Sequence, residues 1–125
     1  MCQIDNDEPA TLWEEDVVIA RKQHVCRCCR GLIRAGQPYT KHFSLFDGDV
    51  TSEKKCAACS LMAEEFLAAH GVYFAPSQMP EALQTCIWEE EHEGEEGRVM
   101  AAKWKRHLRN MERRAATRKA QEAPP

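Results

Sequence analysis

Apolar and polar residues alternate along residues 39–45 with the two-residue period of a β-strand. One face carries Tyr39, Lys41, Phe43 and Leu45, and the other carries Thr40, His42 and Ser44. The dipeptide Asp47-Gly48 is typical of a tight turn, and residues 50–55 then return along the first strand. The pattern predicts a β-hairpin in this part of the chain.

After the hairpin, apolar residues recur every three or four positions, which predicts helices. Met62, Phe66 and Ala69 mark one face of a first helix, whose first turn carries Cys56 and Cys59 and which stops at Gly71. A second helix is entered at Met79-Pro80, and Ser77 is its expected N-terminal cap. The apolar face of this helix consists of Met79, Leu83, Cys86 and Ile87.

Gly94 and Gly97 predict a break, and a last helix then runs from about residue 98 to residue 119. At 1.5 Å per residue this helix is about 33 Å long. Its apolar stripe consists of Met100, Trp104, Leu108, Met111 and Ala115. So narrow an apolar stripe must pack against another surface, either the preceding part of the chain or a second copy of the protein in a homodimer. Packing within the chain is the preferred interpretation for Trp104 and Leu108.

Four segments follow from these patterns. Residues 1–15 are expected to be loose and residues 17–20 to form a short docking strand within an acidic N-terminal segment, 1–20. The remaining segments are a cysteine-containing unit at 21–75, an acidic helix at 76–97, and a basic helix with its tail at 98–125. We expect residues 21–119 to form one compact domain, with no segment that spans a membrane.

The net charge of −3 over 125 residues conceals blocks of alternating sign. Residues 1–20 carry six acidic and no basic residues, and residues 61–97 carry nine acidic and no basic residues. Residues 21–60 and 98–125 are basic, with net charges of +5 and +7. Either the acidic and basic blocks neutralise each other within the molecule, or they present charged faces to partners of opposite sign.

The strongest chemical signal is a pair of C-x-x-C motifs, Cys26-x-x-Cys29 and Cys56-x-x-Cys59, separated by 26 residues. Four thiolates at about 2.3 Å complete the tetrahedral shell of one Zn²⁺ ion and leave no position for water. We therefore predict one structural zinc ion per chain. Gly31 is expected to supply the positive φ angle that the turn after Cys29 requires.

The other cysteines fit this scheme less well. Cys28 could replace Cys26 or Cys29 as a ligand, although it breaks the C-x-x-C spacing, and Cys2 and Cys86 have no partner motif. Disulfide bonding is the competing interpretation of the paired motifs, but the acidic N-terminus is the reverse of a secretory signal. We expect a cytoplasmic protein with reduced thiols, in which such pairs bind zinc.

The order of a cysteine knuckle, a hairpin and a helix that donates the last two ligands resembles the treble-clef zinc finger over residues 24–70. The run His24-x-Cys26-x-x-Cys29, Gly36-x-x-Tyr39, Asp47-Gly48 and Cys56-x-x-Cys59 is also similar to small zinc-binding proteins of bacteriophages and prophages. This resemblance implies an α+β fold: a treble-clef-like zinc core extended by two C-terminal helices. It also implies a small regulator or an inhibitor of a host or defence protein, acting in the host cytoplasm.

Catalysis is not expected. His42 lies on the hairpin, where HNH-type nucleases keep functional histidines, but the second histidine and the asparagine of such a site are missing, so a nuclease relative is a remote alternative. His24 is interpreted as a hydrogen-bonded structural residue, and His70 as a helix C-terminal residue favoured by the helix dipole. A closed four-thiolate shell also cannot activate water.

Function is therefore sought in binding, and the last helix is the candidate surface. Its cationic residues are Lys103, Lys105, Arg106, Arg109, Arg113, Arg114, Arg118 and Lys119. A protein partner is favoured because the chain as a whole is acidic and no aromatic residues alternate with these cations to stack on bases. The alternative is nucleic-acid binding through the phosphate backbone, with weak sequence specificity.

Overall fold

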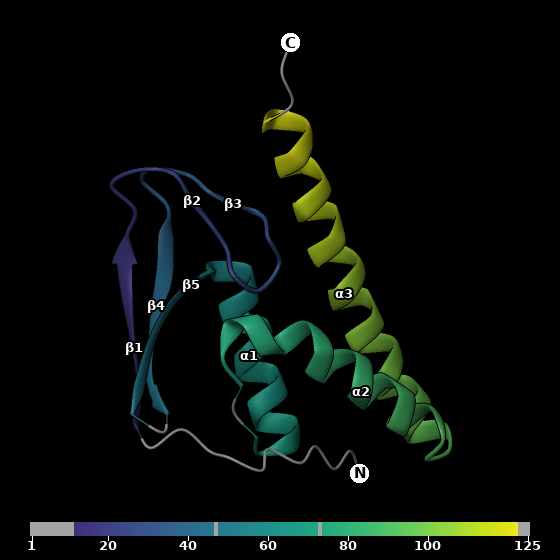
Figure 1. Cartoon of the computed structure of the whole chain (residues 1–125). Helices are drawn as coiled ribbons and strands as arrows, with labels where there is room; N and C mark the ends of the chain where they lie inside the picture. The colour runs from purple at the N-terminus through teal and green to yellow at the C-terminus, as the bar shows by residue number, and fades with distance from the viewer. Residues whose placement is uncertain (1–11, 47, 73, 123–125) are drawn as a thin grey trace.

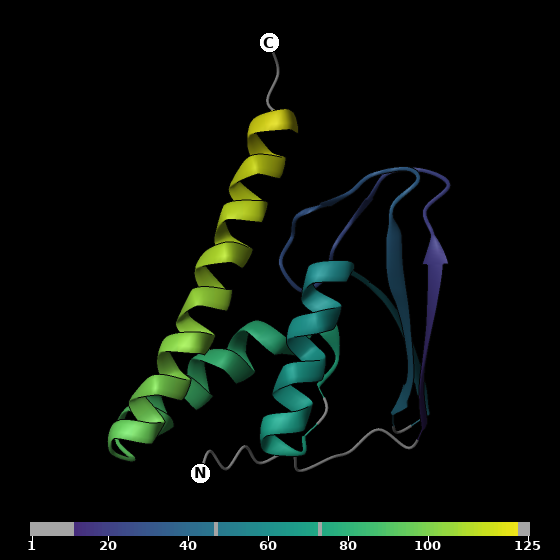
Figure 2. The same cartoon turned by 180° about the vertical axis from the view of Figure 1, so that it is seen from behind.

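The computed structural model describes residues 12–46, 48–72 and 74–122, and its fold is α+β (Figure 1). The strands are β1 (Leu12–Ile19), β2 (His24–Val25), β3 (Leu32–Ile33), β4 (Pro38–Phe46) and β5 (Asp49–Cys56). The helices are α1 (Ala57–His70), the single 3₁₀ turn η1 (Pro76–Gln78), α2 (Met79–Glu91) and α3 (Glu95–Glu122). In both side views α1 lies between the sheet and α3 (Figures 1 and 2).

The predicted hairpin is confirmed as β4 and β5, which pair antiparallel with Phe43 opposite Ser52. β4 is the central strand of the sheet β1-β4-β5, and β2 and β3 form a separate two-stranded ladder. β1 is longer than the predicted docking strand, since it pairs with β4 from Leu12 onward. The expectation of a loose segment up to residue 15 was therefore wrong for residues 12–15, and residues 1–11, with Cys2, lie outside the described part.

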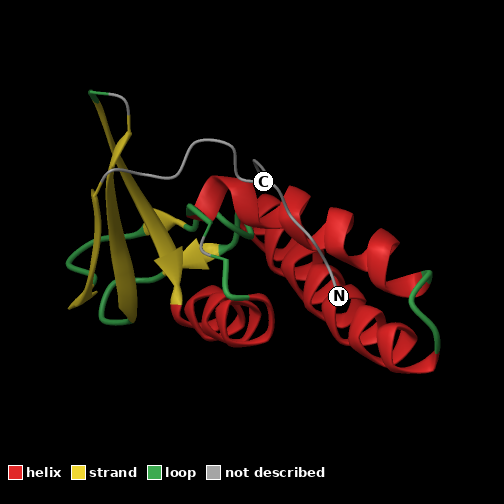
Figure 3. Cartoon of the chain, turned by 90° about the horizontal axis from the view of Figure 1, so that it is seen from below, coloured by secondary structure: helices red, strands yellow, loops and turns green. Residues whose placement is uncertain are grey.

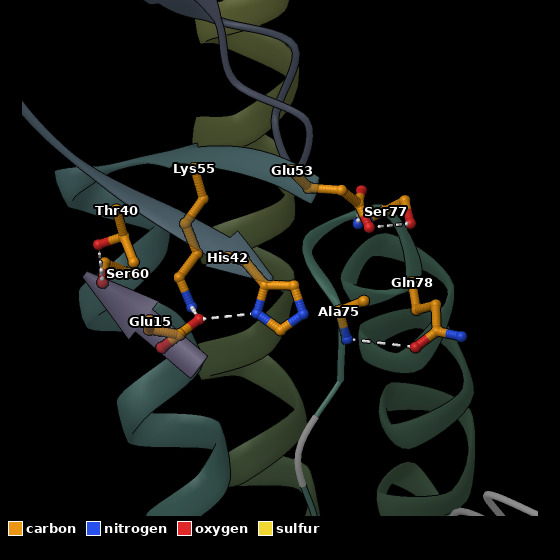
Figure 4. A network of polar contacts seen from close by, with 9 residues as sticks. All are labelled: Glu15, Thr40, His42, Glu53, Lys55, Ser60, Ala75, Ser77 and Gln78. Atoms are coloured by element: carbon orange, nitrogen blue, oxygen red, sulfur yellow. Dashed lines mark hydrogen bonds and ion pairs between the residues drawn. The ribbon is translucent and has the colours of Figure 1, made fainter. Parts of the chain in front are cut away.

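The first half of β1 was missed because acidic residues interrupt its apolar pattern. Glu15 supplies a polar contact where a half-buried strand usually has an apolar one. Its Oε2 lies 3.1 Å from Nδ1 of His42 and 2.7 Å from Nζ of Lys55, and both partners are almost fully buried (Figure 4). Glu15, His42 and Lys55 thus link the three strands of the sheet on one face through polar contacts.

Polar contacts also join this face of the sheet to the helices (Figure 4). The hydroxyl oxygens of Thr40 and Ser60, on β4 and α1, are 3.1 Å apart. Ser77 donates from its backbone N–H and its hydroxyl to the Glu53 carboxylate, at 3.2 and 3.0 Å. Ser77 therefore lies within η1 and bonds to β5. The prediction that it caps α2 was wrong.

The apolar core lies among the three helices and continues to Ile33 of β3 and Tyr39 of β4. Phe66 of α1 contacts Trp104 of α3 with 5.2 Å between ring centroids, and both residues are fully buried. Leu83 and Cys86 bring the predicted apolar face of α2 into the same cluster. The stripe of α3 thus packs within the chain, as preferred. Within the described ranges, no helix combines the length and the apolar run needed to cross a bilayer.

α2 and α3 lie side by side and are joined by a short loop (Figure 3). The predicted break is present at Gly94, where φ is +93°, but α3 begins at Glu95 and includes Gly97. A Cβ atom at Gly97 would lie 2.1 Å from the backbone oxygen of Glu90. Gly97 is therefore not part of the break, because its missing side chain allows the two helices to approach closely.

Candidate metal centre

The paired cysteines converge from three parts of the fold. Cys26 and Cys29 lie in the knuckle between β2 and β3, Cys56 ends β5, and Cys59 lies in the first turn of α1. Their Sγ atoms all lie within 4.8 Å of one another, whereas Cys28, although buried, is not in this group. The pairing of the two C-x-x-C motifs into one cluster is thus confirmed.

The size of the cluster suits zinc. The Sγ atoms of Cys29 and Cys56 are 3.8 Å apart. A tetrahedron with Zn–S bonds of 2.3 Å has an edge of about 3.8 Å, so this distance needs no rearrangement to accept the ion. The four thiolates can hold one metal ion, and sulfur-only ligation in a tetrahedral arrangement is typical of zinc.

Backbone N–H groups donate hydrogen bonds to the sulfur atoms and so favour negative charge on them. The N–H groups of Cys29 and Cys56 donate to Cys26 Sγ at 3.5 and 3.2 Å, and the N–H of Gly31 donates to Cys29 Sγ at 3.3 Å. The knuckle itself is closed by a 2.8 Å hydrogen bond from the Cys26 N–H to the Gly31 carbonyl. Donors aimed at a sulfur atom stabilise the thiolate, which is the form that binds metal.

Gly31 has a different role from the predicted one. The positive φ angle of the turn belongs to Arg30, at +64°, and not to Gly31. A Cβ atom at Gly31 would lie 2.8 Å from Cβ of Arg114 and 3.1 Å from Cys29 Sγ. Gly31 thus leaves space for α3 to pack against the knuckle.

Arg114 is the residue that α3 places against the cluster. Its Nε donates to Cys29 Sγ at 3.3 Å and its Nη2 donates to Cys59 Sγ at 3.5 Å. Burial by itself would lower the pKa of this guanidinium, but hydrogen bonding to Cys29 raises the pKa, and the guanidinium stays charged. Arg114 was assigned to a partner-binding surface, whereas its described side-chain contacts are with Cys29 and Cys59 of the cysteine cluster.

The four thiols cannot all ionise side by side without a cation. Hydrogen bonding from Cys26 and from the other cysteines lowers the pKa of Cys29, and Arg114 adds to this effect. The same crowding raises the pKa of Cys59, with Cys26 as the largest contributor. A bound dication together with the Arg114 charge would compensate most of the four negative charges.

The other predicted binding residues fall into two groups. Lys103 pairs with Glu65 at 3.2 Å, Lys105 pairs with Glu91, and Arg118 contacts the Arg30 carbonyl and Glu122. Arg106, Arg109, Arg113 and Lys119 are exposed. Internal neutralisation of the acidic and basic blocks is therefore real but incomplete.

The histidines take structural positions. The imidazole of His24 lies against the Tyr39 ring, with centroids 5.2 Å apart, and His42 contacts Glu15. His70 is the last residue of α1, as predicted, but its side chain is buried next to Cys86 and Glu90. Sequence reasoning missed this second cluster because its members lie on two helices and share no motif.

No protein-family model, curated protein or solved structure matches this chain.

Proposed function

We propose that this chain is a non-enzymatic, zinc-stabilised binding protein that recognises an acidic surface on a protein partner. The knuckle, the β4–β5 hairpin and α1 form a treble-clef-like core around one structural Zn²⁺. Metal binding and folding are coupled in such small units, and closed tetrathiolate sites are structural and not catalytic. The metal centre thus supports the scaffold, and recognition belongs to another surface.

The observation that carries the proposal is the exposed face of α3. Arg106, Arg109 and Arg113 are spaced three and four residues apart, so they share one face of the helix. None of the ion pairs formed between described residues uses them. An arginine row of this kind suits carboxylate groups, because each guanidinium can bind one with two parallel hydrogen bonds.

A protein partner is preferred over nucleic acid for two reasons. The chain is acidic overall, with a net charge of −3, which repels a polyanion at long range. The side chain of Trp104, the aromatic residue of α3, is fully buried and cannot stack on bases. The likeness to phage-encoded zinc proteins further suggests that the partner is a host or defence protein, which this protein inhibits or regulates.

The test compares three forms of the full-length chain as affinity baits, with and without nuclease treatment, followed by mass spectrometry. One variant reverses the α3 face (Arg106→Glu, Arg109→Glu and Arg113→Glu). The matched control makes the same charge change on exposed cations of the sheet side (Arg21→Glu, Lys22→Glu and Lys41→Glu). We expect a nuclease-resistant partner that is retained by the wild type and the control and lost from the α3 variant.

A mobility-shift titration tests the alternative. Three phosphate contacts predict a slope of about −2.7 for log affinity against log salt, or about 40-fold weaker binding at 200 mM than at 50 mM salt. Tight DNA or RNA binding with this salt dependence, lost in the α3 variant, would replace the protein partner by nucleic acid. Equal capture of the partner by all three baits would refute the role of the α3 face.

A further inference from the structure

A second group of metal-ligand residues lies in the helical part of the core. His70 ends α1, and Cys86 and Glu90 lie one turn apart on α2. The Nε2 atom of His70 is 3.3 Å from Cys86 Sγ and 3.2 Å from Glu90 Oε1, and all three ligand atoms lie within 4.8 Å of one another. The three side chains therefore converge from two helices.

This group is more deeply buried than is usual for polar side chains. The side chains of His70 and Glu90 are 4% and 5% exposed, and Cys86 is fully buried. The His70 ring lies against Phe66 and Trp104, with centroid distances of 4.7 and 5.8 Å. Apolar surroundings of this kind penalise charge unless it is compensated.

Hydrogen bonds satisfy the buried polar atoms of this group only in part. Among the described residues, Nδ1 of His70 and Oε2 of Glu90 are buried without a hydrogen-bond partner. Burial raises the pKa of Glu90 and lowers that of His70, so the protein alone favours the neutral forms of both. A single nitrogen, Nε2 of His70, also faces both the sulfur and the carboxyl oxygen.

We propose that His70, Cys86 and Glu90 bind a second divalent transition-metal ion, with Zn²⁺ as the ion that suits them best. Imidazole nitrogen, thiolate sulfur and carboxylate oxygen are all accepted zinc ligands, and the thiolate and carboxylate together neutralise a dication. Bond lengths of 2.0–2.3 Å imply ligand separations of about 3.3–3.6 Å, close to the two distances at Nε2. Three protein ligands leave the fourth position of a tetrahedral shell without a protein donor.

The second site would differ in character from the first. It has three protein ligands from α1 and α2, whereas the cysteine cluster has four from the knuckle, β5 and α1. An ion at the second site would fix the end of α1 to α2. With one ligand fewer, it should release its ion before the cysteine cluster does.

Zinc stoichiometry tests the proposal on the full-length protein. After saturation with ZnCl₂ and removal of unbound metal, we expect two zinc ions per chain in the wild type. Glu90→Gln preserves the shape of the side chain, and Cys86→Ala removes only the sulfur, so each variant should retain one ion. Glu81→Gln, at an exposed position of the same helix, is the matched control and should retain two.

Cobalt provides a measurement that does not depend on the variants. The first equivalent of Co²⁺ should give the strong sulfur charge-transfer absorption of a four-thiolate site, and the second should add the weaker absorption of a single thiolate. A wild-type plateau at one equivalent overturns the proposal even if a variant fails to fold. Retention of the second ion by folded Cys86→Ala and Glu90→Gln protein overturns it as well. The four-cysteine site would survive either result.

Discussion

Replacing Gly97 by alanine tests the packing of α2 against α3. The added Cβ atom would meet the Glu90 backbone oxygen at 2.1 Å and Cβ of Glu93 at 3.0 Å. Real Cβ contacts essentially never fall below 3.0 Å, so the first contact is 0.9 Å too short. Because the obstacle is a backbone carbonyl, no rotamer change relieves it, and the two helices must move apart.

Two opposing effects set the size of the change. Overpacking a close contact costs about 1–3 kcal/mol, and the rigid backbone partner places Gly97→Ala at the upper end of this range. Alanine favours the helix over glycine by about 1 kcal/mol, which offsets part of the loss. We expect the free energy of unfolding to fall by about 1–2 kcal/mol.

Urea unfolding of the zinc-loaded, full-length protein measures this difference. Ala102→Gly, at an exposed position of α3, provides the control, since it changes helix propensity without a close contact and should cost about 1 kcal/mol. If Gly97 were only a break between helices, alanine would leave stability unchanged or raise it. A stabilised Gly97→Ala protein would therefore refute the close approach of α2 and α3.

Three further predictions concern the metal centre. Cys59→Ser should lose the ion of the cysteine cluster and unfold the hairpin region, because such binding is worth on the order of 10 kcal/mol, whereas Cys28→Ala should keep the ion. Elemental analysis measures the metal content and circular dichroism measures the folding of both variants. Full metal content in Cys59→Ser would contradict the ligand assignment. Arg114→Gln should weaken zinc retention against a chelator about tenfold, or ~1.4 kcal/mol, because the charged hydrogen bonds to the sulfur atoms are lost. Arg113→Gln, at an exposed position, should leave zinc retention unchanged. Equal behaviour of the two variants would disprove the role of Arg114. Gly31→Ala should push Arg114 away from Cys29 and accelerate zinc loss in the same assay, with an unchanged rate as the contrary result.

Local chemistry explains what the sequence could predict. The C-x-x-C spacing, the Asp47-Gly48 turn and the stop at Gly71 each act over a few residues, and the hairpin, α1 and the cysteine cluster were anticipated from them. β1 was underestimated because Glu15 makes its inward contacts through charge, which hydrophobic periodicity does not detect.

Contacts between distant segments explain what the sequence could not predict. Arg114 and Cys29 are separated by 85 positions, and nothing in the basic pattern of α3 distinguishes Arg114 from its exposed neighbour Arg113. Gly31 and Gly97 looked like turn residues, since only the packed structure shows which backbone or side chain a Cβ atom would strike. The structure thus separates the cations of α3 that make contacts within the chain from those that are exposed.

The contact of Arg114 with the cysteine cluster also imposes an order of events during synthesis. Cys59 leaves the ribosome 55 residues before Arg114, which corresponds to roughly 3–11 seconds at 5–20 residues per second. In that interval the four thiolates could already capture an ion, but the guanidinium that balances their charge has not yet emerged. A nascent chain whose α3 has not yet emerged would therefore hold an ion less firmly than the folded protein, and α3 would act as a latch that closes over the candidate metal centre after the cysteines.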